Sequence, residues 1–439
     1  MELEIAVDGA AQTAVTRTPR RPGRQPTYRE IFGVIEFRAL WLAQLLSVAG
    51  DQLARVAMTV LVFDRTHSAL WTALTYAVTF LPWVIGGLAL SGLADRLPRR
   101  QVMVVCDLAR MVLVGLMVLV SLGLPSAAAL WAMVALLFVV TLLDSPFKSA
   151  RSAMLPDVLP GDRYVLGIAV TQTTIQIGMA SGFAVGGLVV AGLGVRTALL
   201  ADAATFAVSA ALAWFWVQNR PVAAKPPAAG GPSPLAEMAG GVRLVFGDRR
   251  LRTLMLLGWL VAFYIVPTGL AAPYATDARS SLPIAVATGL IFAAGPFGTA
   301  IGAIVFGRMV PPAIRQRWMG PLAVAACGVL LLCALHPGMI ASLLIIAGSG
   351  ACASYQLAAN AAFVSAVPPA RRGQAFGLAN GGMQVCQGLW IILAGAVVSS
   401  GAVSPASGVA ISGGVGAVLA AALATSATRQ PTSLGGTSR

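Results

Sequence analysis

The stretch SGLADRLPRR, residues 91–100, is the starting point for predicting the fold of this chain. One apolar run, residues 70–90, precedes it, and a second, residues 102–124, follows it. Each run has the roughly 20 residues that a helix needs to cross a bilayer. The stretch is therefore predicted to be a short loop between two membrane-spanning helices. Its arginines surround one carboxylate, Asp95, where the neighbouring sequence has almost no charge.

The composition predicts a polytopic membrane protein. The chain has 439 residues, of which 57% are hydrophobic and 10% are charged, whereas a soluble domain carries about 25% charged residues. Such a chain cannot cover a water-facing surface. Its apolar runs are about 20 residues long and do not alternate, which favours helices over the short alternating strands of a membrane barrel. We therefore expect an all-α fold.

Twelve apolar runs are expected to span the membrane, six before and six after a linker. The linker, residues 218–250, is rich in proline and glycine and has mixed charge. Within it, residues 235–246 are predicted to form a short amphipathic helix. The expected spans are residues 39–63, 70–90, 102–124, 127–147, 165–193, 197–217, 251–275, 284–305, 319–335, 339–364, 374–398 and 403–423.

This coarse duplication predicts two pseudo-symmetric six-helix halves, residues 37–217 and 251–425. A basic tail, residues 1–36, precedes them and is expected to be disordered. The tail has no early apolar core, so we expect no cleaved signal peptide. A second tail, residues 426–439, follows them, and the proline-punctuated residues 148–163 are expected to form a loop.

The arginines predict the orientation in the membrane. Loops after even-numbered spans carry most of them, whereas the odd-numbered loops carry only Arg65, Arg196 and Arg279. Since positive residues are retained on the cytoplasmic side, both termini and the loop at residues 91–100 are expected in the cytoplasm. The net charge of +14 therefore reflects topology. It forms no continuous basic face, so we expect no nucleic-acid partner.

Asp51 and Arg55 are candidates for function because they lie near the middle of the first span. Each charge at mid-membrane costs roughly 2.5–3.5 kcal/mol, so both side chains should face protein or water. They lie four residues apart, share one helix face and can pair. The alternative interpretation is a structural ion pair that locks this helix to a neighbour.

Two further charged pairs lie in the next spans. Asp144 and Lys148 repeat the spacing of four at the end of the fourth span, which favours a structural or gating role. Asp107 and Arg110 lie one turn apart near the start of the third span. We expect Asp107 and Arg110 to join a charge network around residues 91–100.

Polar and aromatic residues inside the spans could line a substrate cavity. The alternatives are interhelical hydrogen bonds for the polar side chains and ordinary helix packing for the rings. The candidates are Phe80, Trp83, Gln172, Gln176, Tyr264, Phe292, Phe297, Tyr355, Gln356, Asn360, Asn380 and Gln384.

A stripe of small residues runs along the fifth span. Gly178, Gly182 and Gly186 recur every four residues, and Gly187 follows them. Such spacing predicts close helix packing. No HExxH, GxSxG or P-loop sequence occurs, so we expect neither an enzyme nor an ATP-driven pump, and no metal or cofactor. Any pumping would then depend on an ion gradient.

These motifs resemble those of the major facilitator superfamily. Residues 91–100 are similar to its cytoplasmic loop G-x-x-x-D-R-x-G-R-R, with Ser91 and Pro98 at the two glycine positions. Residues 178–187 are similar to its antiporter motif G-x-x-x-G-P-x-x-G-G, with Phe183 at the proline position. Residues 37–52 and 155–157 resemble the bacterial drug and siderophore efflux branch, of the enterobactin-exporter and macrolide-efflux type.

The resemblance implies alternating access in a bacterial inner membrane, with a cytoplasmic gate at Asp95, Arg96, Arg99 and Arg100. Gly307 occupies the position equivalent to Asp95 in the second half, so the gate is expected to be asymmetric. We expect a monomeric, proton-coupled exporter of small amphiphilic molecules such as antibiotics. Asp51 would carry the proton and Arg55 would tune its affinity. An uptake symporter of the same fold and a non-transporting membrane sensor or anchor remain open alternatives.

Overall fold

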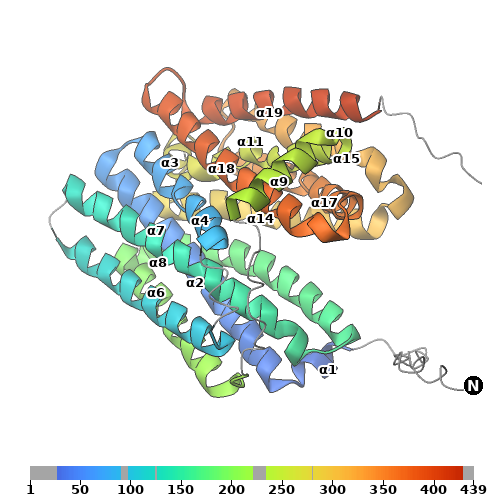
Figure 1. The fold of residues 1–439 in the computed structure, drawn as a ribbon. Helices are drawn as coiled ribbons and strands as arrows, with labels where there is room; N and C mark the ends of the chain where they lie inside the picture. The colour runs from blue at the N-terminus through green and yellow to red at the C-terminus, as the bar shows by residue number, and fades with distance from the viewer. Residues whose placement is uncertain (1–26, 90–96, 124–125, 221–233, 279, 429–439) are drawn as a thin grey trace, which may run out of the picture.

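The computed structural model describes residues 27–89, 97–123, 126–220, 234–278 and 280–428. Every regular element in these ranges is helical, and the helices form a bundle (Figure 1). The elements of the N-terminal half are α1 Tyr28–Phe32, α2 Ile35–Thr66, α3 Ala69–Ala77, α4 Leu81–Ala89, α6 Arg99–Leu122, α7 Ala127–Val158 and α8 Asp162–Trp216.

The rest of the chain begins with a helix inside the predicted linker. Its elements are α9 Pro234–Gly247, α10 Arg249–Trp259, α11 Val261–Tyr264, α12 Val266–Gly269, α13 Ala271–Asp277, α14 Ile284–Met309, α15 Pro312–Gly328, η1 Val329–Leu335, α16 Met339–Cys352, α17 Tyr355–Ala366, η2 Pro369–Arg371, α18 Arg372–Ser399 and α19 Pro405–Thr428.

Eleven helical segments in the described ranges are long and apolar enough to cross a membrane. The longest, α8, has 55 residues and consists of two helices joined at Gly194, whose φ of 85° is not helical. A positive φ is the conformation that glycine adopts without steric cost. The fifth and sixth predicted spans therefore both lie in α8, and the all-α membrane fold with twelve spans is confirmed.

The predicted loop at residues 148–163 is wrong over most of its length. Helix α7 continues to Val158 and contains both Pro146 and Pro156. A proline removes one backbone hydrogen bond, but tertiary packing can outweigh that loss. Here Phe147 and Ala150 are almost completely buried against the N-terminal half. Packing of this last part of α7 therefore keeps it helical.

The predicted amphipathic helix in the linker is confirmed as α9. Its Val245 is fully buried against Leu254 and Phe363 of the C-terminal half. The carboxylate of Asp248 caps the next helix by accepting hydrogen bonds from the backbone N–H groups of Arg250 and Leu251 at 2.7 and 3.1 Å. The seventh span therefore begins two residues earlier than predicted, at the start of α10.

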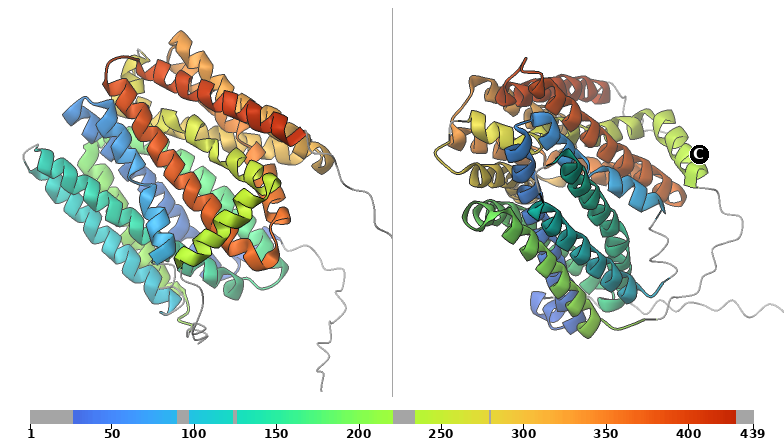
Figure 2. Two further views of the ribbon diagram at one scale, coloured as in Figure 1. Left: turned by 45° about the horizontal axis from the view of Figure 1, so that its top comes forward. Right: turned by 90° about the vertical axis from the view of Figure 1, so that its left-hand side faces the viewer.

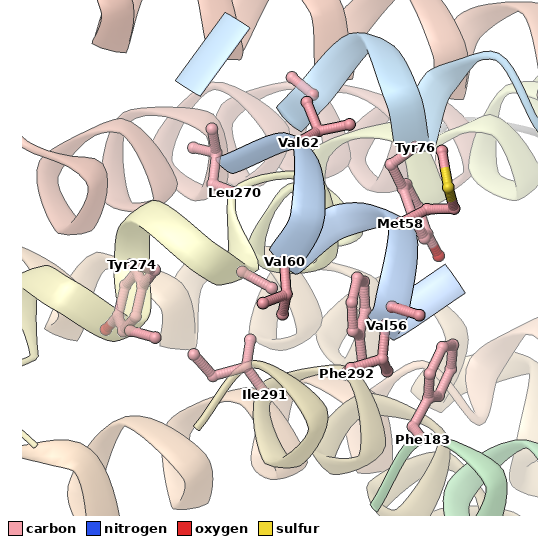
Figure 3. Packing of buried hydrophobic residues seen from close by; sticks show 14 of the residues in the cluster. Val56, Met58, Val60, Val62, Tyr76, Phe183, Leu270, Tyr274, Ile291 and Phe292 are labelled. Carbon is pink, nitrogen blue, oxygen red and sulfur yellow. The ribbon is translucent and has the colours of Figure 1, made fainter. Parts of the chain in front are cut away.

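One apolar core contains residues from both halves. In it, Phe292 of α14 stacks on Phe183 of α8 and on Tyr76 of α3, with ring centroids 4.8 and 5.4 Å apart (Figure 3). Further apolar clusters contain residues of one half only, such as that of Phe37 and Phe147. The halves thus share a core over part of their length and are packed separately elsewhere.

The shared core lies toward one end of the molecule. At this end α3 and α18 lie side by side (Figure 2), and the Ser399 hydroxyl accepts a hydrogen bond from the Leu70 backbone N–H at 2.6 Å. The hydroxyls of Ser68 and Ser399 are 3.3 Å apart. One turn further along, Gly395 lies against Ala73. The two halves are therefore in direct contact at the end formed by the loop at residues 67–68.

Candidate functional site

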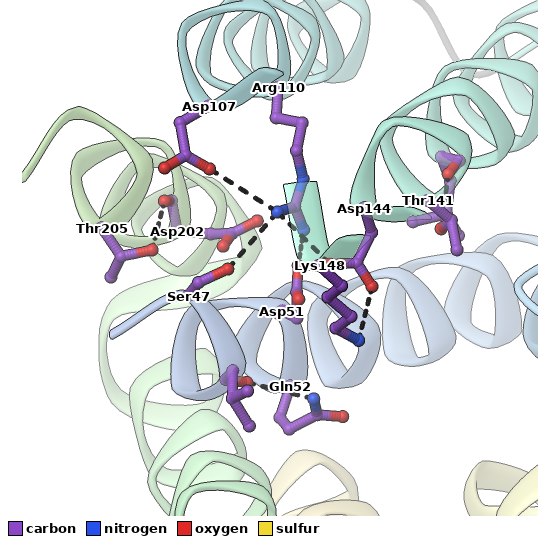
Figure 4. A network of polar contacts seen from close by, with 12 residues as sticks. Ser47, Asp51, Gln52, Asp107, Arg110, Thr141, Asp144, Lys148, Asp202 and Thr205 are labelled. Atoms are coloured by element: carbon purple, nitrogen blue, oxygen red, sulfur yellow. Dashed lines mark hydrogen bonds and ion pairs between the residues drawn. The ribbon is translucent and has the colours of Figure 1, made fainter. Parts of the chain in front are cut away.

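Arg110 is the centre of a buried cluster of charges in the N-terminal half (Figure 4). Its side chain is 1% exposed and donates a hydrogen bond to the Asp51 carboxylate at 2.7 Å. A second nitrogen lies 3.3 Å from the Ser47 hydroxyl and 3.7 Å from both Asp107 and Asp144. One guanidinium therefore lies close to carboxylates from three helices, α2, α6 and α7.

Lys148 extends the cluster along α7. Its ammonium nitrogen lies 2.7 Å from the Asp144 carboxylate, one helical turn away. The same nitrogen lies 3.9 Å from the centre of the Trp83 ring of α4, within cation–π distance. Arg110 has a similar contact, since its guanidinium lies 4.1 Å from the centre of the Phe206 ring. An aromatic face thus contacts each cation: Arg110 in the interior, and Lys148 where its side chain is 31% exposed.

The predicted pairs within single helices are present in part. Asp144 and Lys148 form the expected ion pair, and Asp107 lies one turn from Arg110. Asp51, however, pairs with Arg110, whereas Arg55 forms no ion pair with any residue that the structure describes. The expected pairing of Asp51 with Arg55 is therefore wrong, because Arg110 of the adjacent helix α6 takes that place.

The cluster also contains Asp202, which the sequence analysis missed. Asp202 lies on α8 beyond Gly194 and is 1% exposed. Together with Asp51, Arg55, Arg110 and Asp144 it lines a cavity of about 20 Å³. In the sequence, Asp202 is a single acid inside the sixth apolar run. No oppositely charged residue lies three or four positions from Asp202, so the spacing of charges within the helix did not indicate it.

The arginines of the loop at residues 91–100 lie in a different place. Arg99 forms an ion pair with Asp157 at 2.8 Å and donates to the Ala153 carbonyl, both near the end of α7. The Arg100 guanidinium lies 4.6 Å from the Trp214 ring at the end of α8. Residues Asp95 and Arg96 lie outside the described residues.

The expected single network around this loop is therefore incorrect. Arg99 contacts helix ends, whereas Asp107 and Arg110 are joined to Asp51 and Asp144 in the interior of the half. Arg110 is 11 residues beyond Arg99 along α6, and this length of helix separates the two groups by about 16 Å.

The glycine stripe of α8 brings two pairs of helices into close contact. A Cβ atom on Gly182 would lie 2.8 Å from the Ala49 carbonyl oxygen of α2, and Gly178 and Gly186 also lie against α2. Gly187 points to another helix, since a Cβ there would lie 2.7 Å from the Ala285 carbonyl oxygen of α14. The stripe thus packs α8 against its own half and against the opposite half.

The candidate cavity residues have different environments. Phe292 and Tyr355 are fully buried, and Phe80 is 9% exposed. Tyr355 also donates a hydrogen bond to the Leu257 carbonyl at 2.8 Å. Phe292 and Tyr355 therefore pack inside the protein in this structure, which agrees with the alternative interpretation of these two rings.

Other candidates have accessible surface. Gln356 is half-buried and donates to the Tyr264 hydroxyl at 2.9 Å, and the amide of Gln387 donates to Gln384 at 3.2 Å. Trp83 and Gln176 are half-buried, whereas Gln172, Phe297, Asn360 and Asn380 are exposed. These accessible residues remain candidates for contact with a substrate.

A model of the protein family described as the Major Facilitator Superfamily matches residues 40–385. The chain belongs to this superfamily. The family consists of secondary transporters, so this superfamily member is a multi-pass membrane transporter, and the helical architecture agrees with that assignment.

Two comparisons with curated proteins are informative. The enterobactin exporter EntS of Salmonella typhi is 28% identical over 286 residues, which are 62% of this chain and 64% of that protein. EntS of Escherichia coli O1:K1 is also 28% identical, over 62% of this chain and 63% of that protein. The matched region therefore spans less than two thirds of the length of these relatives.

Solved structures share the fold. The nucleoside transporter NupG superposes with a TM-score of 0.67 at 16% identity, covering 90% of this chain and all of that one. A bacterial homologue of the iron transporter ferroportin, in an inward-facing state, superposes with a TM-score of 0.69 at 14% identity. The match covers 92% of this chain and all of the homologue's chain. At such low identities these likenesses describe the fold alone.

Proposed function

We propose that this superfamily member is a secondary exporter of small amphiphilic molecules and that protons moving inward drive it. The observation that carries the proposal is the contact of Arg110 with Asp51, Asp107 and Asp144 inside the apolar half. Buried charges in membrane helices are costly and mark ion pathways. Protonation of one carboxyl would remove its attraction for Arg110 and allow the helices to rearrange.

Asp51 is our candidate for the group that exchanges its proton with water during transport. Its side chain is 18% exposed, whereas those of Asp107 and Asp144 are 0% and 6% exposed. Among these three acids, Asp51 is therefore the most accessible to water. Arg55, which lines the same small cavity, would tune its affinity for the proton.

Two observations support export. The glycine stripe of the antiporter-like motif packs α8 closely against α2 and α14, so that movement along this stripe would couple the charge cluster to the opposite half. In addition, the EntS proteins, which match 62% of the chain, are described as enterobactin exporters. Both favour outward transport over uptake.

The arginine distribution supports an orientation with both termini in the cytoplasm of a bacterial inner membrane. In that orientation the end formed by Ser68 and Ser399 faces outward and is closed. The halves at residues 37–217 and 251–425 would rock about a central site, with Asp95, Arg96, Arg99 and Arg100 contributing to the cytoplasmic gate. No second subunit is needed for this cycle, and we propose a monomer.

The apolar surfaces of the C-terminal half support an amphiphilic substrate. A cavity of about 450 Å³ lies between α10, α11, α18 and α19 and is lined by Trp259, Phe263 and Trp390 among other apolar residues. This volume is in the range of pockets that hold drug-sized ligands.

Efflux of a fluorescent dye from cells, with and without a protonophore, tests this proposal. We expect export that the protonophore stops and that Asp51→Asn strongly reduces, while Asp162→Asn, which replaces an exposed acid that forms no ion pair with the described residues, leaves it nearly unchanged. Undiminished export by Asp51→Asn would overturn the role of Asp51. Accumulation of the ligand would indicate an uptake symporter, and no flux in proteoliposomes would indicate a sensor or anchor.

A further inference from the structure

Asp202 differs from the other acids of the cluster because it has no ion-pair partner among the residues that the structure describes. Neither of its carboxylate oxygens accepts a hydrogen bond from any residue that the structure describes. Arg110 lies within ion-pair distance of Asp51, Asp107 and Asp144 but not of Asp202. Figure 4 shows Asp202 among the side chains around the guanidinium, with no contact drawn to its carboxylate.

The position of Asp202 is fixed by close packing of α8 against α2. A Cβ atom on Gly50 would lie 2.5 Å from the Asp202 Oδ1 atom and would also collide with the Thr205 hydroxyl oxygen. Only a glycine allows this approach without displacing either side chain. Because Gly50 directly precedes Asp51, the same contact brings Asp202 next to the acid that pairs with Arg110.

Asp202 also faces a cavity that could hold one water molecule. The cavity has a volume of about 20 Å³, and one water needs roughly 10–15 Å³ and two to four polar partners. Three acids, Asp51, Asp144 and Asp202, line it against two bases, Arg55 and Arg110. The lining therefore has one carboxyl more than it has cations.

We propose that Asp202 is a second proton-binding site of the cluster and is a neutral carboxylic acid in the conformation described here. A carboxylate that is buried without a cation or a donor carries a large desolvation cost, which a bound proton removes. The neighbouring cations are already close to other acids: Arg110 to Asp51 on α2, and Lys148 to Asp144 on α7.

Release of this proton follows from the geometry of the cavity. When Arg110 leaves Asp51 and turns toward α8, the O–H bond of Asp202 breaks and the proton passes to water in the cavity. The new carboxylate then pairs with Arg110, while Asp51 takes up a proton from water. The cluster thus holds one proton at a time, on α8 or on α2. The exchange of protons during transport rests on the proposed proton coupling. The protonation of Asp202 in the described conformation does not depend on it.

Infrared spectroscopy of the purified full-length protein tests the site without a substrate. At neutral pH the wild type should show the carbonyl stretch of a protonated carboxylic acid, shifted by exchange into D₂O. Asp202→Asn should remove this band. Asp51→Asn should weaken it, because Arg110 loses its closest carboxylate and is free to pair with Asp202, whereas Asp107→Asn and Asp144→Asn should keep it. The exposed acid Asp157, replaced by asparagine, is the matched control and should also keep it.

Three results would overturn the site. They are absence of the band from the wild type, its persistence in Asp202→Asn, and its loss in Asp107→Asn alone. Gly50→Ala provides a second variant that keeps Asp202. Its methyl group should displace the carboxyl and shift the band, and an unshifted band would contradict the assignment. Asp202→Asn should match the wild type in thermal unfolding temperature, because an amide replaces a neutral acid of the same shape.

The dye assay distinguishes this inference from the proposed function. Protonophore-sensitive efflux without a band at Asp202 overturns the site but keeps proton-driven export. A band at Asp202 together with protonophore-insensitive efflux keeps the protonated site and overturns its exchange with Asp51 during transport. If both proposals hold, Asp202→Asn retains binding of the dye but loses the dependence of efflux on the pH gradient.

Discussion

The Arg110 guanidinium of α6 and the Asp51 carboxylate of α2 are 2.7 Å apart in the interior of the N-terminal half. This ion pair links the third span to the first, although the residues are 59 positions apart in the sequence. Asp107 and Asp144 lie 3.7 Å from the same guanidinium. Arg110 therefore neutralises carboxylates that would otherwise repel one another.

Replacing Arg110 by glutamine should strongly destabilise the protein. Removal of one partner of a buried ion pair costs about 3–5 kcal/mol, because the other charge stays buried without compensation. Thermal unfolding in detergent measures the loss. Arg55→Gln is the matched control, since Arg55 forms no ion pair with the described residues, and it should have a smaller effect. Equal stability of the two variants would contradict the central position of Arg110.

The cation–π contact of Lys148 with Trp83 should be measurable by a double-mutant cycle. The Lys148 nitrogen lies 3.9 Å from the ring centre, and such contacts contribute about 0.5–2 kcal/mol. We expect Lys148→Met and Trp83→Leu to have a combined effect on the free energy of unfolding that is smaller than the sum of the two single effects. Strictly additive effects would show that the contact does not contribute to stability.

The sequence predicted the membrane fold well because its main signals are local. A run of about 20 apolar residues is enough to predict a span, and Gly194 ends the fifth span as expected. The end of α7 could not be predicted in this way. Pro146 and Pro156 are typical helix breakers, and only burial of Phe147 against other helices explains why the helix continues.

The charge cluster could be predicted only where its contacts lie within one helix. Asp144 and Lys148 are four residues apart, and their pairing follows from helix geometry. The choice of Arg110 over Arg55 as the partner of Asp51 depends on how α6 packs against α2. Asp202 has no oppositely charged neighbour in its own helix and meets the cluster only through the close approach at Gly50.

A disulfide between Ser68→Cys and Ser399→Cys should lock the two halves together at one end. The hydroxyl oxygens of these serines are 3.3 Å apart in the described conformation. Alternating access requires this end to open, so oxidation should stop transport and a reductant should restore it. Each single cysteine variant under the same oxidant is the control. Full transport by the cross-linked protein would show that this contact does not separate during the cycle.

Gly289 should be essential for the contact between the halves, and Gly295 of the same helix should not. A Cβ atom on Gly289 would lie 2.6 Å from the Phe183 carbonyl oxygen and 2.8 Å from the Gly187 Cα atom, both backbone atoms of α8. A Cβ on Gly295 would meet nothing within 4 Å. Overpacking of this kind costs about 1–3 kcal/mol.

Because the collision lies between the halves, this cost falls on the conformation in which α8 and α14 are in contact, not on the folding of either half. Gly289→Ala should therefore reduce transport by roughly tenfold, as a cost of about 1.4 kcal/mol implies, while its thermal unfolding changes little. Gly295→Ala should transport like the wild type. Equal transport by the two variants would mean that the contact of α8 with α14 can loosen without slowing transport. The glycine stripe of α8 would then act only within the N-terminal half, where it packs against α2.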